Sequence, residues 1–262
     1  MTHTTINAHS IIKQFHEFMK PDSKYRVLRL IGDANMGKSH LLTKVFPELC
    51  QHHQACCAVI DLRNKNQTIM DFLDLARSRL TTAYGVDFPN YSTAYKELIY
   101  KPIVKVEGVK AFFSEIKIDA KAAPAQDNWH MVQLLTNEFV TDLYQIASRK
   151  CLFLFDSVND ADSNTQTWLM DNLLNKLAPL KHVRVIVAGR SFPEAYGSYA
   201  VNCYSYELKA VQDVQEYVKY CQQINADLVE QSIKDFASAF DYNPGMFAGY
   251  ARKFVPQGVL NG

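Results

Sequence analysis

The chain of 262 residues lacks the features that mark several protein classes. No run of about 18 apolar residues occurs, so we expect no membrane-spanning helix. Residues 1–15 are mostly polar and contain no apolar core of an export signal. Lys and Arg number 28 while Asp and Glu number 27, so the net charge does not indicate a nucleic-acid partner. We therefore predict a cytoplasmic globular protein without membrane association, for which nucleic acid is a less favoured partner.

The sequence also lacks the spacings of disulfide frameworks and zinc sites. None of the cysteines forms a CxxC pair, and the adjacent His52 and His53 have no second pair of ligands at metal spacing. We predict buried, reduced thiols and no structural zinc. The six cysteines are Cys50, Cys56, Cys57, Cys151, Cys203 and Cys221.

Strand and helix patterns alternate along the chain up to residue 190, and helix patterns dominate after it. The run CLFLF at 151–155 is apolar without alternation, which is typical of a strand buried on both faces of a parallel sheet. Strands are predicted at 25–31, 56–63, 151–155, 182–190 and 205–211. Helices are predicted at 9–19, 38–50, 67–85, 129–148, 167–180, 213–223, 228–240 and 244–254.

This order predicts a three-layer α/β fold with a parallel sheet and a small C-terminal helical subdomain. We expect an N-terminal helix within 1–24, the α/β core over 25–203 and the helical subdomain over 204–262. Alternating segments at about 100–120 predict a hairpin inserted into the core. The sequence leaves open whether this hairpin recruits a partner chain or packs on its own domain.

The segment GDANMGKS at 32–39 fits the phosphate-loop pattern G-x-x-x-x-G-K-[ST]. It follows a predicted strand and opens a predicted helix, as a phosphate loop does, so we predict a P-loop NTPase core. The glycines let successive N–H groups turn toward phosphate oxygens, and the helix directs its positive end at the same anion. Lys38 is predicted to reach the β- and γ-phosphates, and Ser39 to bind Mg²⁺. The predicted nucleotide-binding residues of this segment are Gly32, Asp33, Ala34, Asn35, Met36, Gly37, Lys38, Ser39 and His40.

A phosphate loop works with a carboxylate at the end of a neighbouring buried strand, where it holds the metal. Asp156 directly follows the apolar run and is the predicted Mg²⁺ ligand beside Ser39. Hydrolysis also needs a group that orients water, and the residue after Asp156 is Ser157 rather than an acid. Asp160 and Asp162 are candidates for this catalytic role, or equally loop acids or helix caps. Nucleotide binding is therefore better supported than fast hydrolysis.

Two more charged residues end predicted strands. Arg190 closes the segment VIVAGR and is a candidate sensor of the γ-phosphate, the alternative being an ordinary ion-pairing arginine. Asp61 closes AVID and is a candidate contact of the metal-bound water, with a structural role as the alternative.

The expected nucleotide is ATP or ADP. GTPases read guanine with an NKxD-type segment late in the chain, whereas the near match here, NKNQ at 64–67, lacks the acid and comes early. DSVN at 156–159 lacks the glycine of a DxxG segment. No Arg-rich cluster indicates the lid of a small-molecule kinase.

The motifs in their order resemble the nucleotide-binding core of the STAND class of AAA-related ATPases, the NACHT and NB-ARC relatives. The resemblance covers roughly 10–255 and rests on the motif series GDANMGKS, CLFLFD, TWLMDNLLNKL, HVRVIVAGR, YELKAVQDVQEYV and YNPGMFAGYARKF. It implies that the phosphate loop binds ATP, that Asp156 holds Mg²⁺ and that Arg190 is a sensor arginine. It also implies that Pro244 packs near the adenine or couples the helical subdomain to it, the alternative being an ordinary first-turn helix proline.

The resemblance implies an ATP-dependent molecular switch or assembly ATPase, with slow hydrolysis coupled to oligomerisation or to activation of partner chains. The sequence departs from the family at Ser157, where a second acid is frequent, and it shows neither a winged-helix domain nor an effector domain. We therefore expect either one domain of a longer protein or partners on separate chains. The alternatives are a regulatory module that holds nucleotide without turnover and an AAA-type ATPase that acts on DNA.

Overall fold

The computed structural model describes residues 6, 9–64, 66–100 and 125–256, and its centre is a five-stranded sheet whose paired strands are all parallel. The strands lie in the order β2-β3-β4-β1-β5. Their bounds are Val27–Ile31 for β1, Ala55–Asp61 for β2, Lys150–Asp156 for β3, Val183–Gly189 for β4 and Cys203–Glu207 for β5. The prediction of a parallel sheet is therefore confirmed.

The register of the sheet aligns the carboxyl ends of the inner strands. Asp61 at the end of β2 lies opposite Asp156 at the end of β3, and Ile31 at the end of β1 lies opposite Gly189 at the end of β4. Ligand sites in open parallel sheets form at this edge, because the loops that follow the strands meet there.

The two faces of the sheet carry separate hydrophobic cores, because the inner strands are apolar on both sides. In β3, Phe153 and Phe155 belong to one core, whereas Leu152 and Leu154 belong to the other. The first core includes helices α4 (Ile69–Tyr84), α5 (Pro89–Tyr100), α6 (Ala125–Gln145), α8 (Leu174–Leu177) and α9 (Gly197–Ala200). It also includes the π-helical turns Trp168–Leu173, which follow α7 (Ser163–Thr167). The second includes α1 (His9–Met19), α3 (Phe46–His52) and the π-helical turns Leu41–Val45, which connect α3 to the short helix α2 (Lys38–His40). The predicted three-layer α/β fold is confirmed.

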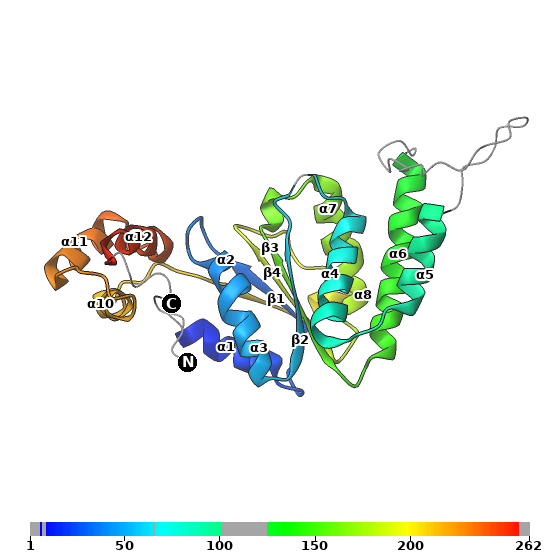
Figure 1. Cartoon of the computed structure of the whole chain (residues 1–262), viewed down its shortest axis with the longest axis horizontal. Coiled ribbons are helices and arrows are strands. Elements are labelled where there is room, and N and C mark those ends of the chain that lie inside the picture. The colour runs from blue at the N-terminus through cyan, green and yellow to red at the C-terminus, as the bar shows by residue number, and fades with distance from the viewer. Residues whose placement is uncertain (1–5, 7–8, 65, 101–124, 257–262) are drawn as a thin grey trace, which may run out of the picture.

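Three helices after β5 form a small subdomain beside the sheet (Figure 1). They are α10 (Val214–Gln223), α11 (Glu230–Ala239) and α12 (Pro244–Ala251). Their shared core contains Tyr217, Tyr220, Ile233 and Phe247. This core is separate from the two cores of the sheet, and Ile6 from the N-terminal segment packs into it.

Helix α5 was not predicted from the sequence. The N–H groups of Asn90 and Tyr91 open this helix, and both donate to the buried carboxylate of Asp142 on α6, at 3.2 and 2.8 Å. The residue that caps the helix thus lies about 50 positions further along the chain, beyond the reach of local patterns. The predicted hairpin at about 100–120 lies outside the described residues except for Tyr100, which ends α5.

The predicted start of the helical subdomain at 204 was too early. Strand β5 spans Cys203–Glu207 and pairs with β1 in a parallel register, so the sheet continues through Glu207. A strand was predicted at 205–211, and β5 confirms it at 205–207 but begins two residues earlier and ends sooner. An edge strand is only half buried, so the weak apolar pattern of CYSYE does not define its bounds.

The six cysteines are free thiols, as predicted. Five of them are buried, and Cys203 on the edge strand is half buried. Among the helices of the described residues, none combines the length and the apolar composition that a bilayer span requires.

Candidate functional site

The phosphate-loop segment connects β1 to α2 at the carboxyl edge of the sheet. The Gly32 N–H donates to the Gly189 carbonyl at 3.2 Å, which ties the start of the loop to β4. Two residues of the loop, Asn35 and Gly37, have positive φ angles of 62° and 87°. A Cβ at Gly37 would meet nothing within 4 Å, so the glycine is needed here for its backbone angle rather than for space. The turn then passes into helix α2.

The ammonium group of Lys38 lies over the loop itself. Its Nζ donates to the carbonyls of Gly32 and Asp33, the second at 2.6 Å. Burial lowers the pKa of Lys38, while the carboxylates of Asp156 and Asp33 act in the opposite direction. The structure thus brings Lys38 into the electrostatic range of Asp156, although they lie 118 positions apart in the chain.

Asp156 is buried at the end of β3 and is only 2% exposed. Its Oδ1 accepts the Ser157 N–H at 2.8 Å, whereas its Oδ2 has no hydrogen-bond partner among the described residues. A buried carboxylate oxygen without a partner is costly, and such oxygens are ligands for hard cations or their bound waters. Ser157 follows in the left-handed conformation with φ 61°, which turns the chain sharply away from the strand.

Asp160 and Arg190 form an ion pair across the ends of β3 and β4. The distance between Arg190 Nη2 and Asp160 Oδ1 is 2.8 Å, and the side chains are 60% and 45% exposed. Asn159, which was not predicted from the sequence, joins the same two loops. Its Oδ1 accepts the Arg190 N–H at 2.5 Å, and its Nδ2 donates to the Ser191 carbonyl at 3.0 Å. The structure thus places Arg190 beside Asp160 in an exposed pair.

Asp61 lies beside Asp156 in the sheet register, but its carboxylate is engaged by a neighbour in sequence. Arg63 donates from Nη2 to Asp61 Oδ2 at 2.6 Å and from Nε to both carboxylate oxygens at 3.0 Å. The Arg63 guanidinium lowers the pKa of Asp61, against the opposing effect of burial. Of the two roles considered for Asp61, the contacts in the described residues correspond to the structural one.

The helical subdomain reaches the phosphate loop directly. The Asn243 Nδ2 donates to the Ala34 carbonyl at 3.1 Å, and the Gly245 N–H donates to the Asn35 carbonyl at 2.8 Å. The Asn243 side chain also caps α12, because its Oδ1 accepts the N–H groups of Gly245 and Met246 at 3.1 Å. One asparagine therefore starts the helix and attaches it to the loop. Neither Asn243 nor Gly245 was singled out in the sequence, although an Asn-Pro-Gly turn at a helix start is a visible signal.

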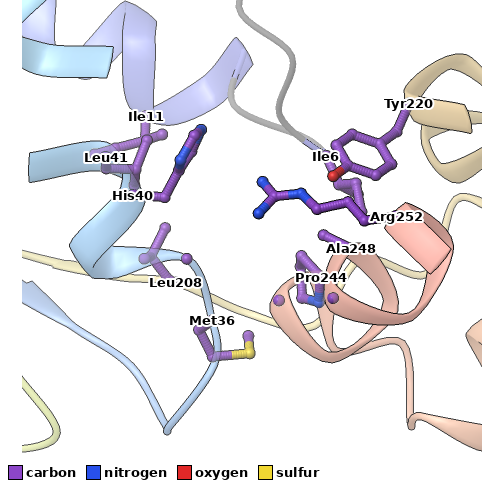
Figure 2. A pocket seen from close by; sticks show the side chains of 13 residues that line it. Ile6, Ile11, Met36, His40, Leu41, Leu208, Tyr220, Pro244, Ala248 and Arg252 are labelled. Atoms are coloured by element: carbon purple, nitrogen blue, oxygen red, sulfur yellow. The ribbon is translucent and has the colours of Figure 1, made fainter. Parts of the chain in front are cut away.

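A cavity of about 260 Å³ opens between the loop and the subdomain (Figure 2). One wall comes from the core and the loop, and includes Met36, Gly37 and His40, while the opposite wall comes from α12 and includes Pro244. Arg252 extends from the end of α12 toward His40 across this space (Figure 2). The remaining lining residues are Ile6, Ile11, Leu41, Leu208, Tyr220, Gly245, Ala248 and Gly249. The cavity begins where the phosphate loop passes into α2.

The fold therefore gathers most of the residues predicted from the sequence at one edge of the sheet. Lys38 lies within electrostatic range of Asp156 and of the Asp160–Arg190 pair. His40 and Pro244 line the cavity beside them. Ser39 is exposed on the first turn of α2. Arg252 and Tyr220 also line the cavity and were not predicted, because nothing in their local sequence indicates this position.

A parallel sheet of this kind, with a phosphate-loop segment between β1 and the helix after it, is the fold of P-loop NTPases. Compared by sequence, the chain matches no protein family model and no curated protein. Compared by structure, it is similar to the Walker-type ATPase Paby2304 of Pyrococcus abyssi, with a TM-score of 0.52 and 13% identity over 94% of this chain and 67% of the other. This likeness supports the fold.

Two further solved structures are similar at lower scores. Cdc6p from Pyrobaculum aerophilum gives a TM-score of 0.47 and 10% identity, and the match covers 82% of this chain and 48% of that one. Drosophila ORC bound to DNA gives a TM-score of 0.47 and 16% identity, and the match covers 94% of this chain and 54% of that one. The chain thus spans about half the length of these two proteins.

Proposed function

We propose that this chain is the nucleotide-binding unit of an ATP-dependent switch of the STAND type, which hydrolyses ATP slowly. One observation carries the proposal: the helical subdomain donates hydrogen bonds to two carbonyls of the phosphate loop, those of Ala34 and Asn35. A phosphate that turns the N–H groups of this loop also moves the carbonyls on the same peptide units, because each peptide is planar. Binding at the loop is therefore coupled to the position of the subdomain.

The donor set at the sheet edge fits Mg²⁺. The unpartnered Oδ2 of Asp156 is a buried oxygen ligand, and the exposed hydroxyl of Ser39 is a second oxygen donor on the first turn of α2. When bound, Mg²⁺ would supply positive charge to the phosphate oxygens. In the proposed site, Lys38 leaves the loop carbonyls that its Nζ now contacts and binds the β- and γ-phosphates.

Slow turnover follows from the groups around Asp156. The next residue is Ser157, and Asp160 is held in an ion pair with Arg190. The Asp160 carboxylate is thus directed to a guanidinium rather than presented to a water molecule. In the proposed switch, ATP and ADP hold different positions of the subdomain, and the difference is transmitted to further copies of the chain or to separate partner proteins.

The direct test is ATP binding by the wild type and by Lys38→Ala, measured by calorimetry. Loss of a charge-assisted hydrogen bond to phosphate should weaken binding by about 10- to 100-fold. Lys44→Ala is the matched control, because Lys44 lies on the same continuous helix and is exposed. Equal affinity of wild type and Lys38→Ala would exclude the phosphate-loop assignment. Light scattering with ATP, with ADP and without nucleotide then tests the coupling to assembly.

A second candidate is a regulatory module that holds nucleotide without turnover. It is favoured by the left-handed turn at Ser157, which directs the chain away from the strand end where a second acid would be needed. A single-turnover assay with Mg-ATP separates the candidates. Phosphate release that is lost in Asp156→Asn, at nucleotide saturation, would exclude the inert module. Tight binding without release would exclude the ATPase.

A further inference from the structure

Tyr220 on α10 carries a buried hydroxyl group whose position has no structural explanation within the subdomain. The residue is 2% exposed and its ring packs in the core of the three helices. Its Oη has no hydrogen-bond partner among the described residues. Tyr220 also lines the cavity beside the phosphate loop, and Figure 2 shows its hydroxyl directed toward the space near Ile6 and Arg252.

The neighbouring Tyr217 shows how the same subdomain satisfies a buried tyrosine. Its Oη donates to the Tyr242 carbonyl at 2.5 Å, which closes α10 against the turn before α12. A buried hydroxyl that lacks such a partner destabilises the folded protein, because it gives up its hydrogen bonds to water without replacing them. The hydroxyls of Tyr91 and Tyr199 are also unpartnered among the described residues, but of the three tyrosines Tyr220 is the one that lines the cavity, where a ligand can supply the partner.

The position of Tyr220 in the cavity indicates which part of a nucleotide it meets. Phosphates bind at the loop, so Met36 and Gly37 mark the phosphate end of the cavity. Tyr220 lies on the opposite side of this space from Met36 (Figure 2). The far end of the cavity, with Ile6, Ile11 and Ala248, offers the apolar surfaces on which a planar base can pack.

The lack of a carboxylate among the described residues that line the cavity favours adenine over guanine. Guanine presents N–H donors that need an acceptor such as a carboxylate, and no Asp or Glu is among the described residues that line the cavity. Adenine presents ring nitrogens that accept hydrogen bonds. A tyrosine hydroxyl can donate to such a nitrogen, and it can also accept from the exocyclic amine.

We propose that the Tyr220 hydroxyl hydrogen-bonds the edge of the adenine base and is a specificity-determining residue of the nucleotide site. This inference rests on the proposed function, because it assumes that the loop binds the phosphates. It makes Tyr220 a direct sensor of the base on α10, whereas Asn243 and Gly245 contact the loop from α12. Two elements of the subdomain then respond to the nucleotide at its opposite ends.

The test compares wild type, Tyr220→Phe and Tyr217→Phe by calorimetry with ATP, with GTP and with inorganic tripolyphosphate. Tyr220→Phe removes one oxygen and should weaken ATP binding roughly 3- to 10-fold, reduce the preference for ATP over GTP and leave tripolyphosphate binding unchanged. Without nucleotide, its melting temperature should be equal to or above that of the wild type, because an unpartnered polar atom is removed. Tyr217→Phe loses a formed hydrogen bond and should lower the melting temperature.

The outcomes separate the two proposals. If the wild type binds neither ATP nor tripolyphosphate, the proposed function is wrong, and the assignment of Tyr220 falls with it. If the wild type binds ATP through Lys38 but Tyr220→Phe binds ATP equally well, the proposed function stands and the assignment of Tyr220 is wrong. An equal loss of ATP and tripolyphosphate binding in Tyr220→Phe would also overturn the assignment of Tyr220 as a contact of the base. In that case the residue would act through the position of the subdomain.

Discussion

A single methyl group at position 245 should separate the helical subdomain from the phosphate loop. A Cβ built on Gly245 would stand 2.0 Å from the carbonyl oxygen of Asn35, whereas real Cβ contacts are essentially never under 3.0 Å. The Cβ position is fixed by the backbone of residue 245, and the carbonyl oxygen is part of the backbone of Asn35, so no side chain can rotate away to make room. In Gly245→Ala, α12 and the loop must therefore move apart by about 1 Å or more.

The magnitude follows from the contacts that this movement breaks. The bonds from Gly245 to Asn35 and from Asn243 to Ala34 are 2.8 and 3.1 Å long, and neither survives such a shift. Two hydrogen bonds contribute about 1–3 kcal/mol to docking of the subdomain, which corresponds to a change of about 5- to 150-fold in the docking equilibrium. Alanine in the first turn of α12 also favours the helix by up to about 1 kcal/mol relative to glycine, which offsets part of the loss in the free energy of unfolding. The global stability should thus change little, while docking weakens strongly.

The assay measures both quantities. Urea unfolding gives the global stability, and calorimetry gives the affinity for ATP, which we expect to fall at least severalfold because the cavity needs walls from both parts. Gly249→Ala is the control for stability, since it lies in the same helix and its Cβ would meet no atom within 4 Å. Gly249 lines the cavity and so does not serve as a control for affinity. Wild-type ATP affinity in Gly245→Ala, within a factor of two, would refute the coupling of loop and subdomain.

Two further predictions concern the stability of the α/β core. Asp142→Ala should lower the free energy of unfolding by about 2–4 kcal/mol, measured in urea. The reason is that the N–H groups of Asn90 and Tyr91, which open α5, lose their buried acceptor. A loss below about 0.5 kcal/mol would show that water replaces the carboxylate. Acidification should also destabilise the protein, because burial, and then the charge of nearby His16, holds the pKa of His53 below its ordinary 6.5. The unfolded chain then binds the proton more readily, so stability falls as the pH decreases through 6.5 toward the folded-state pKa. The urea midpoint of the wild type should therefore be lower at pH 5.5 than at pH 7.5, and this difference should be smaller in His53→Gln. An equal difference in both proteins would contradict the prediction.

The phosphate loop and the inner strands could be predicted because their signals are local. The loop pattern lies within 32–39, and its strand and helix lie directly on either side. The unbroken apolar run at 151–155 predicts a strand buried on both faces, since such a strand has no polar face to alternate with. Asp156 follows from the end of that run, because the carboxyl ends of parallel strands meet at one edge of the sheet.

Helix α5 and strand β5 depend on partners far away in the chain. The first N–H groups of α5 are satisfied by Asp142, and β5 is a strand because β1 offers it a free edge. Short segments of mixed polarity take the structure that their neighbours stabilise, so their own residues are weak predictors. The pairing of Arg190 with Asp160 is likewise decided by the positions of two loops.

By itself, the sequence determined a parallel α/β core with a phosphate-loop pattern, and it predicted Lys38 and Asp156 as residues of a nucleotide site. Only the tertiary structure decided that Asn243 and Gly245 bind the loop carbonyls and that Tyr220 faces the cavity. The physical reason is that a phosphate loop is specified by a few consecutive backbone angles and side chains, whereas a cavity between two hydrophobic cores exists only after both have packed. Residues that face such a cavity belong to segments about 200 positions apart, and no local pattern connects them.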